Sequence, residues 1–437
     1  MKLVTDLAPL RSSPVFRRLW IGTTLSQVGG AMTTYAVTLQ VWDTTHSTAA
    51  TGALGVVTLV PMLLIALPGG SLADAVDRRK VVLVMTVCSA VVSGALFLQS
   101  LAGGHWLWLV YVLVALSSAI GAVNAPARRT FIRSIVTPDQ LPAALALNRV
   151  SFQTMLIGGA ALAGVVTGAA GLKGCYFIDM VSFAGSLYGV SRMPAIPASP
   201  SGGSQLARTR EGLAYVWRNR VLAGAFLADV NATFFALPVS LFPAINAARF
   251  GGDPRTLGLF TSAIGVGGMV TAMLSRPFTK VTRQGIGMLA SVAVWGLAFA
   301  VFAIAPSLWL TLLALGVAGA ADSITVVFRG IIVQRVTPPE LLGRVNAADY
   351  VVGAGGGQLG SLESGLVGAV TSAEFSALAG GLLTVAGALA IAGWIPAFRR
   401  YRDEEVAAPA STAESEGTAK PGSTAKPDDT ATVPSSA

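Results

Sequence analysis

Four ionisable residues lie inside long apolar stretches of this 437-residue chain: Asp229, Asp322, Arg329 and Glu363. A charged side chain at the centre of a membrane helix costs about 3 kcal/mol or more, so it normally faces a partner or a water-filled cavity. Intramembrane carboxylates often carry protons or hold substrate. We therefore predict that these residues line a polar cavity and couple protons to substrate. The alternative, that they form buried ion pairs that only fix helix packing, stays open.

The spacing of these residues sets their expected depth. Asp229 follows the arginine before its apolar stretch by nine residues, about 13 Å along a helix. Asp322 and Arg329 are seven residues apart and therefore share one helix face, about 10.5 Å from each other along the axis. That separation favours a shared polar cavity over a direct salt bridge. Glu363 is expected in the outer half of its span, and Asp179 is expected to reach outer water.

Apolar stretches long enough to cross a membrane must position these residues. The chain is 53% hydrophobic and 12% charged, whereas soluble proteins carry about 25% charged residues. A membrane helix needs about 20 apolar residues, and such stretches recur at 19–41, 49–71, 81–102, 106–125, 145–170, 174–191, 221–246, 256–275, 284–305, 307–328, 345–370 and 374–396. They lack the alternating pattern of a β-barrel. We predict an all-α integral membrane protein with twelve transmembrane helices.

Positive charge is distributed unevenly along the chain. The net charge is +9, and of 30 Lys and Arg residues only Lys173, Arg249 and Arg255 fall outside the two tails, the even-numbered loops and the helix ends beside them. This bias predicts a multi-pass protein of the cytoplasmic (inner) membrane with both termini in the cytoplasm. It favours the lipid bilayer, not nucleic acid, as the partner of the basic residues. The first 20 residues lack the short apolar core of a removable signal peptide, so the first span is expected to remain.

The chain repeats itself at an offset of 200 residues. Val-Thr-Pro at 136–138 recurs at 336–338, and Arg129 matches Arg329. Internal repeats of this kind are common in secondary transporters, whose substrate site lies between the repeats. We expect two pseudo-symmetric six-helix halves. The predicted divisions are an N-terminal half at 1–192, a cytoplasmic linker with a short amphipathic helix at 193–220, a C-terminal half at 221–396 and a disordered tail at 397–437.

Several common motifs are missing from the sequence. It has no phosphate-binding GxxxxGK[ST] loop, no nucleophile elbow and no cluster of metal-ligand residues. We therefore expect no enzymatic activity and no cofactor, with the proton gradient as the energy source and a monomer as the working unit. His46 and His105 fall in predicted outer loops, where they are either pH sensors or ordinary loop residues. A non-transporting membrane sensor or scaffold stays an alternative, and a membrane enzyme is the poorest option.

The short loop GGSLADAVDRRK at 69–80 resembles the signature between spans two and three of the major facilitator superfamily. The positions that fit are Gly70, Leu72, Asp74, Arg78 and Arg79, whereas Ala75 and Asp77 depart from the pattern. Stretches 121–157 and 221–370 resemble the drug-and-siderophore exporter branch, most closely at 337–353 and 359–369. The resemblance covers nearly the whole chain except its tail.

The resemblance implies a mechanism as well as a fold. Gly70, Asp74, Arg78 and Arg79 would form a latch at the cytoplasmic gate, closing against the next half near Arg344. The two halves would rock about a central cavity. The implied activity is proton-coupled export of amphipathic organic compounds such as drugs or siderophores, with a dedicated siderophore exporter as the alternative. At 158–159 a Gly-Gly pair replaces the Gly-Pro usual in antiporters of this superfamily.

Overall fold

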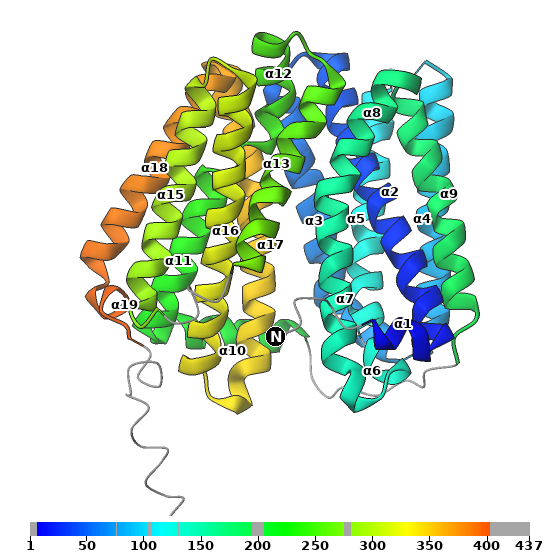
Figure 1. Ribbon diagram of the computed structural model, residues 1–437, viewed down its shortest axis with the longest axis horizontal. Coiled ribbons are helices and arrows are strands. Elements are labelled where there is room, and N and C mark those ends of the chain that lie inside the picture. Colours follow the sequence, from blue (N-terminus) through cyan, green and yellow to red (C-terminus); the bar gives the residue numbers. More distant parts are fainter. Residues whose placement is uncertain are drawn as a thin grey trace, which may run out of the picture.

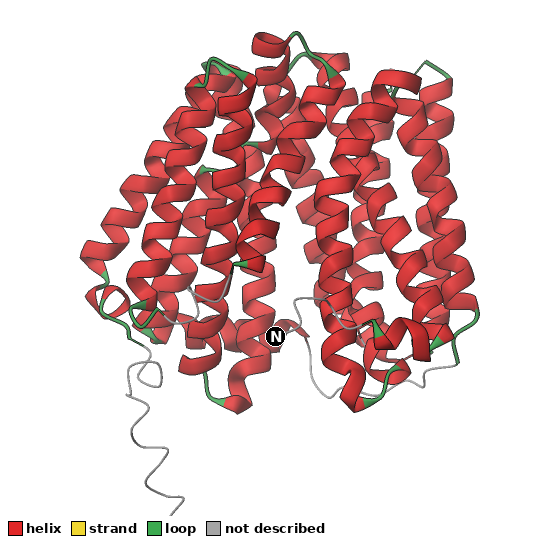
Figure 2. Ribbon diagram, viewed as in Figure 1, coloured by secondary structure: helices red, strands yellow, loops and turns green. Residues whose placement is uncertain are grey.

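The computed structural model describes residues 7–75, 77–103, 106–129, 131–194, 205–274 and 281–402, with only the backbone described at 66–75, 129, 133 and 205. Nearly all of these residues are helical, and none of them lies in a strand (Figure 2). The first helices are α1 Ala8–Ser12, α2 Pro14–Thr45, α3 Thr48–Ala75, α4 Arg78–Leu101, α5 Leu107–Arg129, α6 Phe131–Ile135, α7 Leu141–Thr154, α8 Ala160–Ala170 and α9 Leu172–Ser191. The later helices are α10 Gln205–Arg218, α11 Arg220–Phe235, α12 Phe242–Phe250, α13 Pro254–Met273, α15 Gln284–Ile304, α16 Leu308–Val336, α17 Pro339–Val370, α18 Ala373–Trp394 and α19 Pro396–Arg399.

Many of the described helices are long and apolar enough to cross a membrane. Among the described residues, 9 helical segments are long and apolar enough to cross a membrane. The helices α2, α9 and α17 are also long, with 32, 20 and 32 residues, but they carry more polar and charged side chains. Together these segments account for all the predicted spans. The three polar helices are packed against apolar neighbours, which lets them carry functional side chains within the bundle.

Two predicted spans are not continuous α-helices. The stretch 221–246 was expected to be one helix, but α11 ends at Phe235 and a 3₁₀ turn, η3 Val239–Leu241, precedes α12. Pro238 lies at this break, where it has no N–H to continue a helical hydrogen-bond ladder. The stretch 145–170 contains a π-helical segment, η2 Met155–Gly159, between α7 and α8. Such bulges are common at functional sites.

The helices form two groups (Figure 1). Helices α2–α9 lie together on one side and α11–α18 on the other, while α10 lies across the lower end of the bundle. We call the end that carries α1, α10 and α19 the proximal end, and the opposite end, with the loops at 46–47, 171 and 251–253, the distal end. The division into an N-terminal half at 1–192 and a C-terminal half at 221–396 remains a prediction, and we use these names for the two groups of helices.

Helices α3 and α17 join the two groups at their distal ends. Thr48 Oγ1 donates to the carbonyl oxygen of Gly365 (2.9 Å), and Thr51 Oγ1 donates to that of Ser240 (2.8 Å). A side chain at Gly365 would lie 2.8 Å from the Cα of Gly52, so only paired glycines allow this approach. Small residues of this kind let membrane helices pack with their backbones in contact.

A second seam joins α2 and α8 to α13. Tyr35 OH donates to the carbonyl oxygen of Pro254 (2.6 Å), and Ser262 Oγ donates to that of Ile157 (2.8 Å) in the π-helical segment. The two seams close the distal end of the molecule. The described hydrogen bonds between the N-terminal and C-terminal groups lie in the distal half and in the middle of the bundle.

Candidate functional site

Arg329 is the centre of an ion cluster in the C-terminal half. Its guanidinium contacts Oδ2 of Asp229 on α11, and its Nε lies 3.4 Å from Oδ1 of Asp349 on α17. The exposed fractions of the side chains are 15% for Arg329, 7% for Asp229 and 29% for Asp349. The two carboxylates balance the charge of the guanidinium. This pairing lowers the free-energy cost of holding a charged group within a membrane protein.

A glycine of α17 leaves room for this cluster. A Cβ at Gly353 would lie 4.0 Å from both Nη1 of Arg329 and Oδ2 of Asp229. Farther along α17, a Cβ at Gly360 would lie 2.4 Å from the carbonyl oxygen of Thr233, so α11 and α17 approach with their backbones close together. The glycine run of α17 therefore lets α11 and α17, which carry Asp229 and Asp349, pack closely.

Asp322 lies seven residues, about two helical turns, before Arg329 on α16 but does not form an ion pair with it. Its side chain is exposed, although Asp229, Arg329 and Arg149 all act on it electrostatically. The charged groups near Asp322 come from both halves: Asp229 and Arg329 from the C-terminal half and Arg149 from the N-terminal half. Arg149 belongs to α7, so the electrostatic environment of Asp322 includes a cation of the opposite half.

Glu363 is separate from this cluster. It lies fourteen residues beyond Asp349 on α17, about 21 Å along the axis, and its side chain is partly buried. No ion pair involves it within the described part of the chain. The structure therefore groups Asp229, Asp322 and Arg329 and leaves Glu363 nearer the distal end.

A cavity of about 500 Å³ lies between the two halves beneath the distal seams. Its lining comes from α2, α5, the π-helical segment and α8 on one side and from η3, α12 and α13 on the other: Gln27, Gly30, Ala31, Thr34, Tyr35, Thr38, Ser117, Met155, Leu156, Ala160, Val239, Phe242, Pro243, Leu257 and Thr261. Apolar walls with a few hydroxyl and amide groups suit an amphipathic organic molecule. None of the four ionisable residues predicted to line a cavity belongs to this lining.

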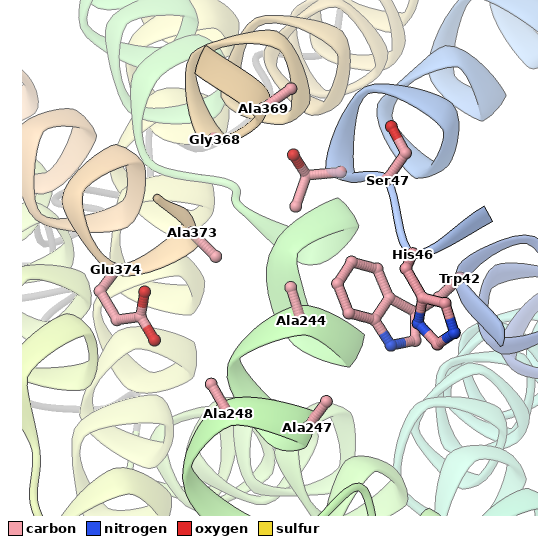
Figure 3. Close-up of a pocket in the computed structure, with 11 residues that line it drawn as sticks. Trp42, His46, Ser47, Ala244, Ala247, Ala248, Gly368, Ala369, Ala373 and Glu374 are labelled. Carbon is pink, nitrogen blue, oxygen red and sulfur yellow. The ribbon is translucent and has the colours of Figure 1, made fainter. Parts of the chain in front are cut away.

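An open pocket of about 540 Å³ also lies between the distal ends of the two halves. Figure 3 shows Trp42 and His46 on one side of this pocket, Glu374 on the other and alanines of α12 between them. Arg249 lies 3.8 Å from Glu374. The pocket lies over the seam that must open if the central cavity is ever to reach the distal side.

The predicted latch residues are only partly described. The side chains of Gly70 and Asp74 lie outside the described residues, although their backbone belongs to α3. Arg79 donates to the carbonyl oxygen of Ser191 at the end of α9 (2.6 Å). Arg78 lines a pocket of the N-terminal half, discussed below.

Arg344, the expected partner of the latch, is engaged elsewhere in this conformation. Its Nη1 lies 2.7 Å from Oε2 of Glu211 on α10. A Cβ at Gly212 would lie 2.1 Å from the Arg344 carbonyl oxygen, so α10 packs directly on the start of α17. The amphipathic segment between the halves is thus tied to the C-terminal half, and pairing of the latch with Arg344 stays a prediction.

Sequence reasoning missed several buried polar residues. Asp349 lies inside a predicted span, only five residues after Arg344, and was not among the predicted site residues. Asp179 was expected to reach outer water; that is wrong, because it is 2% exposed and accepts hydrogen bonds from Thr33 (2.7 Å) and Ser93 (2.6 Å). The 200-residue repeat could have pointed to Asp349, because the corresponding position in the N-terminal half, Arg149, is also charged.

The sequence profile of the transmembrane secretion effector family matches residues 4–415. Curated relatives include the enterobactin exporter EntS of Citrobacter koseri, 24% identical over 398 residues that cover 91% of this chain and 95% of the relative. The enterobactin exporter EntS of Escherichia coli O157:H7 is 24% identical over 414 residues, covering 94% of this chain and 98% of the relative.

Solved structures with the same fold include the nucleoside transporter NupG (TM-score 0.68, 16% identity, 89% of this chain and 100% of that one). A bacterial homologue of the iron transporter ferroportin in its inward-facing state has a TM-score of 0.68 at 14% identity, covering 87% of this chain and 98% of that one. The solved structures show the fold, and the family match with the curated relatives defines the class as a multi-pass major facilitator transporter, not an enzyme. Within that class, the chain belongs to the transmembrane secretion effector family. The predicted all-α, twelve-helix fold in two pseudo-symmetric halves and the resemblance to the exporter branch are confirmed.

Proposed function

We propose that this transporter exports amphipathic organic compounds across the cytoplasmic membrane and that inward proton movement drives the export. The observation that carries the proposal is Asp322, an exposed carboxylate beside the Asp229–Arg329–Asp349 cluster in the middle of the bundle. A carboxylate that reaches internal water can bind and release protons, and the guanidinium beside it makes its charge state sensitive to the partners of Arg329.

The coupling we propose follows from competition for Arg329. When Asp322 or Asp229 takes up a proton, the guanidinium loses part of its compensation and draws closer to Asp349. Because Asp349 is carried by α17 and Asp229 by α11, the change alters how these two helices pack against each other. Glu363, nearer the distal end, is a second proton carrier in this scheme.

The proposed orientation places the proximal end in the cytoplasm, as the distribution of Lys and Arg predicts. The conformation described is then closed toward the outside by the Thr48–Gly365 and Tyr35–Pro254 contacts. Substrate enters the central cavity of about 500 Å³ from the cytoplasmic side or the inner leaflet. Asp74, Arg78 and Arg79 form the latch that closes that side, with Gly70 one helical turn before Asp74 on α3. A monomer is sufficient, because each copy holds both halves of the cavity.

Proton flux into proteoliposomes tests this function. Purified protein is reconstituted in vesicles that hold a pH-sensitive dye, and an amphipathic compound is added against an imposed proton gradient. We expect substrate-dependent proton flux that Asp322→Asn lowers by about tenfold or more and that Asp229→Asn and Glu363→Gln also reduce. The matched control is Asp139→Asn, which changes an exposed carboxylate in the short 3₁₀ helix at Pro138–Gln140. Normal flux in all three test variants would end the proposal of proton coupling.

A dedicated siderophore exporter is the second candidate, because the curated relatives are named enterobactin exporters and are matched over nearly their full length. Growth of a deletion strain separates the candidates. Poor growth under iron limitation with unchanged drug tolerance supports the dedicated exporter. Increased drug sensitivity with normal growth in low iron supports broad export.

A further inference from the structure

A second pocket, of about 1000 Å³, lies entirely within the N-terminal half. Its lining comes from α2, α4, α5, α6, α7 and α9. One part of its wall is polar and basic: Thr23, Gln27, Arg78, Asn124, Arg128 and Asn148. Another part is aromatic: Phe16, Trp20, Phe131 and Phe183. Its described lining contains no aspartate or glutamate. The proposed function does not use this pocket.

Arg128 on α5 is the anchor of the basic wall. It donates from Nη2 to Ser186 Oγ (2.7 Å) and Thr86 Oγ1 (3.1 Å), both buried hydroxyl groups. It also donates from Nη1 to Thr23 Oγ1 (3.1 Å) and from Nε to Asn124 Oδ1 (3.2 Å). These four contacts hold the guanidinium in one place, and they leave one of its five N–H groups for a ligand.

The described partners of Arg128 are all neutral, so no described residue compensates its charge. No carboxylate contacts it in the part of the chain that the structure describes, although the side chain is partly buried. A desolvated cation without an anionic partner is costly. A bound anion would supply the missing charge, and a guanidinium can hold a carboxylate or a similar planar oxyanion.

Arg128 has no cationic counterpart in the C-terminal half, because the 200-residue offset matches it to Phe328 and matches Arg329 to Arg129. In the C-terminal half Arg329 has Asp229 and Asp349 as partners. At an offset of 200 residues, these carboxylates correspond to Gly29 and Arg149. The N-terminal half has therefore a glycine and a further cation where the C-terminal half has acids.

We infer that the pocket around Arg128 binds the anionic group of an amphipathic substrate, a carboxylate or an acidic phenolate, while the aromatic wall covers the apolar part. This inference rests on the proposed export function and deepens it by naming the charge of the substrate. The cationic wall and the acidic cluster lie in different halves, so substrate and proton occupy separate sites.

Equilibrium binding of a matched pair of probes tests the inference. Pyrenebutyrate and its uncharged amide are titrated into the full-length protein in nanodiscs, and energy transfer from tryptophan is recorded, since Trp20 lines the pocket. We expect the wild type to prefer the carboxylate. Arg128→Gln should weaken carboxylate binding by about tenfold or more and leave amide binding within about twofold. Arg128→Lys should restore most of the preference.

The matched control is Arg218→Gln, which removes an exposed arginine of α10. If Arg128→Gln does not fold, Asn148→Asp places a carboxylate in the same wall and should weaken carboxylate binding selectively. Equal affinity of the wild type for both probes would overturn the inference. So would unchanged selectivity in Arg128→Gln, or in Asn148→Asp where the first variant does not fold.

The binding assay needs no gradient, so its failure is distinguishable from failure of the proposed function. Selective carboxylate binding without proton-driven transport of any amphipathic compound would reject export and leave the anion site in place. Proton-driven export of cationic or neutral compounds without a preference for anions would reject the anion site alone.

Discussion

Arg329 can be a structural residue, a coupling residue or both, and its two partners differ enough to separate these roles. Asp229 is nearly buried, whereas the Asp349 side chain is 29% exposed. Loss of the buried partner leaves Arg329 with a single, more hydrated carboxylate. Breaking a buried ion pair by removing one member costs about 3–5 kcal/mol in the cases known, more than removing both members together.

We therefore expect Asp229→Asn to lower the thermal unfolding temperature markedly and Asp229→Asn with Arg329→Gln to recover part of that loss. Unfolding is followed in detergent by tryptophan fluorescence, with Asp139→Asn as the control. A double variant that is less stable than either single variant would show that Asp229 and Arg329 do not compensate each other's buried charge.

Sequence reasoning recovered part of this site. Asp229, Asp322 and Arg329 stand out because a charge is rare within an apolar stretch, and two of them lie on one face of α16. Asp349 was missed because nearby charges mark the helix end, and only the tertiary packing carries that part of α17 into the bundle. Arg128 was missed for the same reason, since its partners come from α2, α4 and α9.

At the scale of elements, α17 has two faces with different tasks. Its glycines meet α11 around Gly356 and Gly360 and meet α3 around Gly365. The first contact lies within the C-terminal half, and the second crosses to the N-terminal half. The sequence indicated a run of small residues, but the breaks at Pro238 and in the π-helical segment were visible only in the folded chain.

The distal seam should be sensitive to one added methyl group. We expect Gly365→Ala to weaken the contact of α17 with α3, because the new Cβ would lie 2.5 Å from the Thr48 carbonyl oxygen. Labelling of Ser47→Cys by a water-soluble maleimide from the distal side should then become faster. Gly330→Ala is the matched control, since nothing lies within 4 Å of its added Cβ. Equal labelling rates in the two variants would contradict the role of the seam.

The contact between α10 and α17 should contribute little to stability. Arg344 and Glu211 are 43% and 55% exposed, and an exposed ion pair is worth at most about 1 kcal/mol. We expect Glu211→Gln to change the unfolding temperature slightly and transport little, and Arg344→Gln to slow transport, because Arg344 is also the proposed partner of the latch. Equal transport in both variants would argue against that second role.

At the scale of the whole molecule, the conformation described is closed at its distal end by hydrogen bonds between the two halves. The fold class was predictable from the sequence. The length of the apolar stretches matches the thickness of the bilayer, and the 200-residue repeat indicates two related halves. Whether each end is open or closed was not predictable, because that depends on which of two conformations of similar free energy is populated.

The latch belongs to the same scale, because it acts only when the halves approach at the proximal end. We expect Asp74→Asn to lower turnover several-fold while substrate affinity stays within about twofold. Transport rate and equilibrium binding are measured on the same preparation. An altered affinity with unchanged turnover would show that Asp74 acts on substrate and not on the gate.

The central claim is that protonation drives a rocking motion that opens the distal end as the proximal end closes. Spin labels at Ser47→Cys and Ala248→Cys report the distal end, and labels at Asp139→Cys and Glu340→Cys report the proximal end, each pair in a background with Cys88→Ser and Cys175→Ala. When the pH is lowered, we predict a population in which the distal distance grows and the proximal distance shrinks. Asp229→Asn combined with Asp322→Asn should abolish this dependence on pH. Two distances that do not change, or that change in the same direction, would contradict the account.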